Sequence, residues 1–260
     1  MKFVTDEVNK SHCEVKHTEK EGIPQYAYCL FDYGVMPAPA STAVHIAFII
    51  DGTGYYNGMK IKTGDIIAYG INKEPMITRV ENVAVFIVSM EFWLFYQMTG
   101  IIPAVCQNII QFKKEDSIYI IGEKLLAHSP EKWMYIVEDY INEIQDSGKY
   151  KFTNQMTRVF NATNLCHIQN QKSSKEVASD LNISHRQLQR DFNSILGITL
   201  KEYESIVRFH KAVNHLEEKN IVQSAVEAGY WDQSHMIREF KRMCGYTPTY
   251  IKKNQTNEVK

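Results

Sequence analysis

Long apolar runs are scarce in this sequence of 260 residues. The longest, such as residues 44–50, are far too short to cross a bilayer, and residues 1–10 contain no apolar stretch of signal-peptide length. The sequence therefore predicts a cytoplasmic protein with no membrane partner. Because 44% of the residues are hydrophobic, the chain can still bury a sizeable core, and its length predicts two domains.

Paired cysteines are also lacking. None of the five cysteines is spaced as Cys-x-x-Cys, and their odd number argues against a disulfide framework or a zinc ribbon. The pattern predicts reduced, mostly structural thiols at Cys13, Cys29, Cys106, Cys166 and Cys244.

No catalytic constellation is recognisable. The sequence lacks a phosphate-binding loop, a nucleophile elbow, paired histidines and a cysteine with an evident base. His45 is the only histidine on a predicted strand, and a single imidazole cannot form a metal site, so we interpret it as structural. His12, Cys13 and His17 cluster near the N-terminus, where a frayed polar segment is the favoured interpretation. We therefore predict no enzyme activity, no metal and no cofactor.

Charge is divided unevenly along the chain, although the formal net charge is only −1. Residues 1–150 carry 13 Lys and Arg against 19 Asp and Glu, whereas residues 151–260 carry 16 against 11. The second part is the candidate binder of a polyanion such as DNA. A solvated surface explains an imbalance of this size equally well, so charge supports the assignment without making it.

The basic part contains an internal repeat with a period of 48 residues. Five pairs of similar residues align in this register: Leu188 with Met236, Arg190 with Arg238, Phe192 with Phe240, Gly197 with Gly245, and Thr199 with Thr247. An apolar residue, an arginine, a phenylalanine and a closing glycine are typical of an amphipathic helix that ends at a C′ glycine. The sequence therefore predicts one helix used twice.

Each copy of this helix is preceded by a shorter one. Four polar residues with capping chemistry mark the predicted helix starts: Ser173, Ser184, Asn220 and Asp232. Gly229 is expected to end the short helix of the second copy, with a turn one residue longer than in the first. Each copy thus predicts a helix-turn-helix unit.

A connector helix is predicted between the copies. It begins at Thr199 with Glu202 and has about 18 residues, so it spans roughly 27 Å. That length is near the spacing of about 34 Å between successive major grooves on one face of DNA. The two longer helices are therefore predicted to enter adjacent major-groove segments.

The longer helices have one apolar and one polar face each. The apolar stripes consist of Leu188, Phe192, Ile195 and Leu196 in the first copy, and of Met236, Phe240, Met243 and Cys244 in the second. The candidate DNA-binding side chains on the outward faces are Arg186, Gln189 and Arg190, and Gln233, Ser234, Ile237 and Arg238. Arginine matches guanine, glutamine matches adenine, and an apolar side chain can contact the thymine methyl group. A solvated helix face would explain either copy alone, but not the recurrence of the arginines.

Several short motifs run through residues 174–253. They are S-H-R-Q-L-Q-R-D-F from Ser184, G-I-T-L-K-E-Y from Gly197, R-F-H-K-A from Arg208, G-Y-W-D-Q-S-H-M-I-R-E-F-K from Gly229 and G-Y-T-P from Gly245. With these motifs the stretch resembles the DNA-binding domain of the AraC/XylS family of bacterial transcription regulators. The resemblance covers about a third of the chain and implies base-facing roles for the seven side chains named above. Leu200 departs from it, since a proline is common there, but the Thr199 cap remains.

Residues 26–90 contain short runs typical of β-strands. The predicted strands are residues 26–33, 44–50, 55–56, 59–62, 66–69, 76–80 and 83–90. Asn57-Gly58 is a type I′ hairpin signature, and Glu81-Asn82 is expected to join the last two strands. We predict a small β-barrel or jelly roll, which is similar at a coarse level to the cupin-like effector or dimerisation domains of such regulators.

Two further segments carry apolar residues with more than one interpretation. Phe86, Phe92 and Trp93 are candidates for an apolar ligand pocket, although a barrel core with its covering helix is favoured. Residues 129–131 begin a helix whose seam packs against an earlier helix or forms a dimer contact; the seam consists of Trp133, Val137, Tyr140 and Ile144.

The predicted fold is α+β with four segments. They are a cupin-like β-barrel at 1–112, a helical segment and linker at 113–150, a double helix-turn-helix domain at 151–253 and a disordered tail at 254–260. The leading hypothesis is a transcription regulator that reads an asymmetric, bipartite site in double-stranded DNA. Its candidate further partners are RNA polymerase, a small-molecule effector and a second copy of the chain. The alternatives are a cupin enzyme with a DNA-binding appendage and an interaction adaptor that has lost DNA binding.

Overall fold

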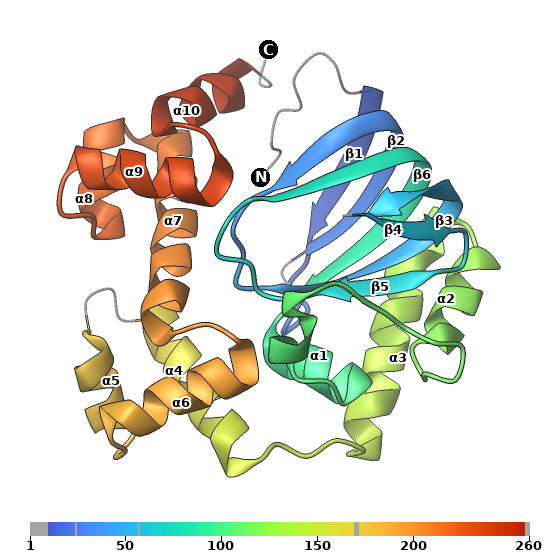
Figure 1. Cartoon of the computed structure of the whole chain (residues 1–260), viewed down its shortest axis with the longest axis horizontal. Coiled ribbons are helices and arrows are strands. Elements are labelled where there is room, and N and C mark those ends of the chain that lie inside the picture. The colour runs from blue at the N-terminus through green and yellow to red at the C-terminus, as the bar shows by residue number, and fades with distance from the viewer. Residues whose placement is uncertain (1–9, 24, 57, 169–171, 258–260) are drawn as a thin grey trace.

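A sheet domain and a helical domain lie side by side (Figure 1). The computed structural model describes residues 10–23, 25–56, 58–168 and 172–257. None of the described helices combines the length and apolar character needed to cross a membrane.

The described residues of the sheet domain form seven antiparallel strands. They are β1 (Lys10–His17), β2 (Gln25–Ala38), β3 (Val44–Tyr56), β4 (Met59–Lys62), β5 (Ile66–Tyr69), β6 (Met76–Met90) and β7 (Ile110–Gln111). The strands pair in the order β1-β2-β6-β3-β5-β7, and β4 pairs with β3 outside this path. The described residues show no pairing between β1 and β7, so the path ends at these two strands. The prediction of an antiparallel β domain with helices is confirmed.

Both faces of the sheet are buried. Phe48 and Phe86 lie on one face, with their ring centres 6.3 Å apart, and belong to the same apolar core as the covering helices α1 (Phe92–Thr99), α2 (Tyr119–Leu126) and α3 (Trp133–Ser147). Ile49, Ile67 and Val85 form a second core on the opposite face, which the curvature of the strands encloses (Figure 1). The alternation of side chains along each strand supplies both cores.

The prediction of a break within the last long strand is wrong. Residues 76–80 and 83–90 form one continuous strand, β6, rather than two strands joined by Glu81-Asn82. Asn82 has a positive φ of 46°, and its carbonyl oxygen approaches the backbone of Gly52 on β3 so closely that a side chain at Gly52 would collide with it. The turn signal at Asn82 therefore marks a local distortion, where only a glycine fits opposite.

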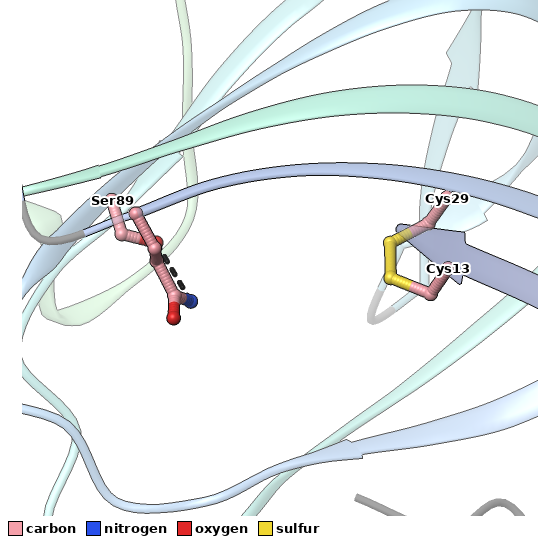
Figure 2. Close-up of a disulfide and its surroundings, with 4 residues drawn as sticks. Cys13, Cys29 and Ser89 are labelled. Atoms are coloured by element: carbon pink, nitrogen blue, oxygen red, sulfur yellow. Dashed lines mark hydrogen bonds between the residues drawn. A yellow bond between two sulfur atoms is a disulfide. The ribbon is translucent and has the colours of Figure 1, made fainter. Parts of the chain in front are cut away.

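The predicted reduction of all five cysteines is also wrong. Cys13 and Cys29 face each other in the β1–β2 register and form a disulfide with their Cα atoms 4.1 Å apart (Figure 2). Cys106, Cys166 and Cys244 remain free. Since β1 includes both Cys13 and His17, the expected frayed terminus is instead an edge strand that is crosslinked to its neighbour.

The predicted hairpin and helix start are found in the structure. Tyr56 pairs with Met59, so the β3–β4 connection has two residues; Asn57 lies outside the described residues. The turn η2 (Pro130–Lys132) leads into α3, whose residues Trp133, Val137 and Tyr140 are buried in the core. The α3 seam is therefore intramolecular packing in this chain. The helix ends at Ser147, and Gly148 begins the connection to the helical domain.

The helical domain contains the two predicted helix-turn-helix units on either side of a connector. Its helices are α4 (Asn154–Ile168), α5 (Ser174–Asp180), α6 (His185–Leu196), α7 (Leu200–Glu218), α8 (Ile221–Ala228), α9 (Gln233–Cys244) and α10 (Pro248–Asn257). The capping boxes at Ser173 and Thr199 are both present, as predicted. Figure 1 places the two units at opposite ends of α7.

Two details of this domain differ from expectation. Residues 181–184 and 229–232 form the two turns, which are equally long; the extra residue of the second unit lies in α8, which has 8 residues against 7 in α5. The prediction of a disordered tail from residue 254 is wrong for residues 254–257, because helix α10 continues to Asn257. At the start of this helix, Thr247 Oγ1 accepts a hydrogen bond from the backbone N–H of Tyr250.

Candidate nucleic-acid interface

The first recognition helix, α6, separates its apolar and polar faces as the sequence predicts. Ser184 caps its start by accepting from the backbone N–H of Gln187 at 3.1 Å, and Gly197 ends it with a φ of 74°. The four residues of the predicted apolar stripe are all buried. Arg186, Gln189 and Arg190 are exposed on the opposite face. All three predicted base-facing side chains of this copy are therefore available to a ligand.

The second recognition helix, α9, repeats this arrangement. Asp232 accepts from the backbone N–H of His235 at 2.6 Å, and Gly245 ends the helix with a φ of 79°. Gln233, Ser234 and Arg238 are exposed, whereas Ile237 is half-buried. The apolar Ile237 thus lies at the edge of the exposed face and presents less surface than the other three.

An ion-pair network that the sequence analysis missed lies behind α6. Asp191 is only 1% exposed, and its Oδ2 accepts from Arg158 Nε of α4 at 2.7 Å. Its Oδ1 accepts from Gln187 Nε2 at 2.6 Å, and Gln187 Oε1 in turn accepts from Arg190. A predicted base-reading arginine is therefore connected through two side chains to a neighbouring helix.

The second copy contains related charges in a looser arrangement. Arg208 of α7 lies 50 residues after Arg158, and its Nη1 is 3.8 Å from Glu239 Oε2. Glu239 Oε1 is 3.2 Å from Arg242 Nη2 and 4.0 Å from His235 Nε2. The signal that could have revealed both networks is the acidic residue that follows the arginine in each copy, in Arg-Asp-Phe and Arg-Glu-Phe.

The sheet domain contacts the C-terminal ends of both recognition helices. Gln107 donates to the carbonyl oxygen of Gly197 at the end of α6. The backbone N–H of Ala40 donates to Met243 O near the end of α9 at 2.7 Å. Both contacts lie at the ends of the helices opposite to their capped N-termini. The N-terminal turns of α6 and α9 therefore remain free of these contacts.

Side-chain contacts join the sheet domain to the connector helix α7. His210 Nε2 lies 2.8 Å from Ala40 O, and Lys73 Nζ lies 2.8 Å from Glu202 Oε1. Burial lowers the pKa of His210, so the ring is neutral at physiological pH and donates one N–H to Ala40. The connector is thus held at more than one point along its length.

His45 has a structural environment. Its Nδ1 is 2.9 Å from Ser89 Oγ, and its ring stacks on Tyr69 with centres 4.7 Å apart. Burial, together with repulsion from His210, lowers the pKa of His45 to about 4. Among the described residues, no group of three His, Cys, Asp or Glu side chains is arranged to hold a metal ion.

A cleft of about 700 Å³ lies where the two domains meet. Its lining includes Ile71 and Lys73 of the sheet domain and Ile198 of the helical domain. The three aromatic candidates for a ligand pocket lie elsewhere: Phe86 packs between Tyr26, Phe48 and Trp133, and Trp93 packs against Phe160, while Phe92 is buried in α1. These aromatic side chains belong to the apolar core that the sheet shares with its covering helices.

The family model described as a helix-turn-helix domain matches residues 177–254. This range contains α6, α7, α8 and α9 with their caps. The C-terminal part of the chain is an AraC/XylS-type helix-turn-helix domain. This domain identifies the chain as a DNA-binding transcription regulator.

The fold of the whole chain is similar to that of ToxT from Vibrio cholerae. An apo structure of a ToxT variant has 10% identity and a TM-score of 0.53, and the match covers 93% of this chain and 96% of that one. A ToxT structure with an unsaturated fatty acid bound has 12% identity and a TM-score of 0.52, with 96% and 97% covered. Comparison with curated proteins found no match. At such identities the likeness to ToxT describes the fold.

Proposed function

We propose that this regulator reads two adjacent major-groove segments of one DNA site, the first with α6 and the second with α9. The observation that carries the proposal is an exposed arginine at the same position of both helices, Arg190 and Arg238, which the 48-residue repeat aligns. Each helix also exposes a glutamine, Gln189 or Gln233, at positions that the repeat does not align. Arginine can pair bidentately with guanine and glutamine with adenine in the major groove.

The connector supports the two-segment arrangement. Helix α7 has 19 residues, which corresponds to roughly 28 Å at 1.5 Å per residue, against about 34 Å for one turn of DNA. The two units carry different side chains at several matched positions, such as Arg186 and Ser234. Unequal units are expected to read unequal segments, so one chain suffices for an asymmetric site.

Selection from a random DNA library, followed by titration at two salt concentrations, tests this proposal. The expected result is a site with two conserved segments about one turn apart, bound less tightly at higher salt because phosphate contacts release counterions. A single contacted segment would contradict the two-segment reading. Failure to enrich any sequence would favour an interaction adaptor instead.

The interdomain cleft is the proposed effector site of the sheet domain. Its lining is mixed: it includes the apolar side chains of Ile71, Met76 and Ile198, the ammonium group of Lys73, and polar side chains such as Glu74 and Gln107. This combination fits an apolar carboxylic acid, the class to which the fatty acid bound by ToxT belongs. A ligand carboxylate would compete with Glu202 for Lys73 and thereby weaken a contact between the domains.

Thermal shift with oleic acid, compared with methyl oleate, tests the effector proposal. The acid is expected to raise the melting temperature, the ester to have a smaller effect, and Lys73→Met to remove the difference between them. Equal shifts for acid and ester would exclude a role for Lys73. No shift with either compound would leave self-association or a protein partner as the signal received by this domain.

A further inference from the structure

The exposed arginines at equivalent positions of the two recognition helices have different surroundings. Arg190 of α6 donates to Gln187 Oε1. Arg238, its counterpart in α9, makes no hydrogen bond or ion pair within the described part of the chain. The repeat therefore places the same residue type in one restrained and one unrestrained setting.

The direction of each hydrogen bond around Gln187 is set by chemistry. Arg158 can only donate and the Asp191 carboxylate can only accept, so their 2.7 Å contact has one possible direction. The second carboxylate oxygen also only accepts, so the Gln187 amide must turn its NH₂ group toward Asp191, at 2.6 Å. Its carbonyl oxygen then points away from Asp191 and accepts from Arg190.

Burial restrains this chain of hydrogen bonds, which runs from Arg158 through Asp191 and Gln187 to Arg190. Asp191 is 1% exposed and Arg158 is partly buried, with 29% of its side chain exposed, so the charge pair is largely shielded from water. Removing either partner of such a pair would leave an uncompensated buried charge, so the pair stays formed in the folded protein. Gln187 is held by it and in turn limits the rotamers of Arg190. An arginine that is already ordered loses less conformational entropy when it binds a base.

We infer that Arg158, Asp191 and Gln187 form a relay of positioning residues that orders Arg190, so that Arg190 discriminates its base pair more strictly than Arg238 does. The inference rests on the proposed reading of DNA by α6 and α9. One Arg190 N–H bonds to Gln187, and the remaining guanidinium donors stay available for a bidentate contact with guanine.

Two single substitutions break the relay in different ways. Gln187→Met removes the bridging amide and leaves the Arg158–Asp191 pair in place. Asp191→Asn keeps the size of the side chain but reverses the relay. Arg158 can only donate, so it must bond to the one remaining oxygen of Asn at position 191, and the new NH₂ group then faces Gln187. The Gln187 amide must turn over to accept from that NH₂ group. Its own NH₂ group then points at Arg190, which can no longer donate to it. Both substitutions are expected to release Arg190.

A double substitution provides the rescue. With Asp191→Asn and Gln187→Glu together, the carboxylate at position 187 accepts from the amide at position 191 and from Arg190, so the order of donors and acceptors is restored. A merely structural role for Asp191 predicts no such recovery. The coupling between the two positions is therefore the diagnostic quantity.

The experiment measures the relative affinities of the full chain for its selected site with each of the four base pairs at every contacted position. Arg190→Ala identifies the base pair read by Arg190. Gln187→Met and Asp191→Asn are each expected to reduce discrimination there about tenfold, with the profile at the α9 segment unchanged, and the double substitution is expected to recover most of it. Gln145→Met, the same change at an exposed glutamine of α3, is the matched control and is expected to change nothing.

The outcomes separate this inference from the proposed function. If the wild-type chain shows no sequence preference, the proposed function fails. If it binds specifically and both single variants, shown by circular dichroism to be folded, keep the wild-type profile, the relay has no positioning role. A uniform loss of affinity at all positions, with no recovery in the double variant, would make the network a stabilising feature of the fold only.

Discussion

The imidazole of His210 and the backbone of Ala40 are hydrogen-bonded, with His210 Nε2 2.8 Å from the carbonyl oxygen of Ala40. The backbone N–H of Ala40 donates to Met243 O at 2.7 Å. One fully buried residue of the β2–β3 connection therefore contacts both the connector α7 and the end of the recognition helix α9. This connection therefore couples the sheet domain to the connector and to the second unit.

Substitution of His210 tests this coupling. His210→Phe fills a similar volume but removes the donor, so the buried Ala40 carbonyl loses its partner on α7. We expect the free energy of unfolding to fall by about 1–3 kcal/mol, as measured by urea denaturation. Asn214→Ala, at an exposed position of the same helix, is the control and is expected to change little. Equal effects of the two changes would show that the contact does not stabilise the domain arrangement.

The proposed base-reading roles of Arg190 and Arg238 can be tested by substitution. Arg190→Ala and Arg238→Ala are each expected to weaken binding to the selected site by about 1–3 kcal/mol and to relax the preference at one base pair, because each removes a donor fork for guanine. Competition titrations with single-base variants of the site measure both effects. Unchanged site affinity in both variants would contradict the base-reading assignment.

The caps and faces of α6 and α9 could be predicted from sequence because they depend on local chemistry. Ser184 and Asp232 bond to backbone groups three residues away, and the apolar stripes follow the helical period. The Arg158–Asp191 pair could not be predicted in this way. It depends on the packing of α4 against α6, and the sequence separation of the two residues gives no indication of that contact.

The sheet shows the same division between local and long-range information. The two-residue connection at Gly58 follows from its local turn signal. The disulfide requires the register that places Cys13 opposite Cys29, and the continuity of β6 through Asn82 requires Gly52 on another strand. Both features are fixed by strand pairing, which the periodicity of a single segment does not specify.

The stability of the protein is expected to depend on pH through two histidines whose pKa values the fold lowers. Desolvation lowers the pKa of the half-buried His45 to about 4 and also lowers the pKa of the half-buried His210, whereas an unfolded histidine titrates at about 6.5. Between these values the unfolded chain binds more protons than the folded one, so stability rises with pH and is lost as pH falls from about 6.5 toward about 4.

Urea denaturation at pH 7 and at pH 5 measures this dependence, and the range stays above the titration of most carboxylates. His45→Asn keeps a polar group near Ser89 but no longer titrates, so we expect a smaller loss of stability between the two pH values. His128→Asn, at an exposed histidine, is the control. The same pH dependence in wild type and His45→Asn would exclude His45 as a source.

The disulfide is expected to stabilise the sheet domain. It joins residues 16 apart, and in the loop-entropy model a crosslink of this length contributes about 3 kcal/mol. Cys13→Ser should therefore lower the free energy of unfolding by up to about that amount under oxidising conditions and have little effect in the presence of a reductant. Cys166→Ser, at a half-buried free thiol, is the matched control. Five reactive thiols in the unfolded, unreduced protein, rather than three, would show that the bond does not form.

The fluorescence of the exposed Trp231 can report whether the second unit contacts DNA. It precedes the N-cap Asp232 of α9 and is 93% exposed, whereas Trp93 and Trp133 are 8% and 3% exposed. If the N-terminal turn of α9 enters the major groove, DNA will shield Trp231 from water and leave the two buried rings unchanged. We expect saturating specific DNA to alter the tryptophan emission and to reduce quenching by acrylamide, and Trp231→Phe to abolish both changes while retaining binding. Unaltered quenching in the wild-type complex would place this turn away from the DNA and remove α9 from the proposed reading of the second segment.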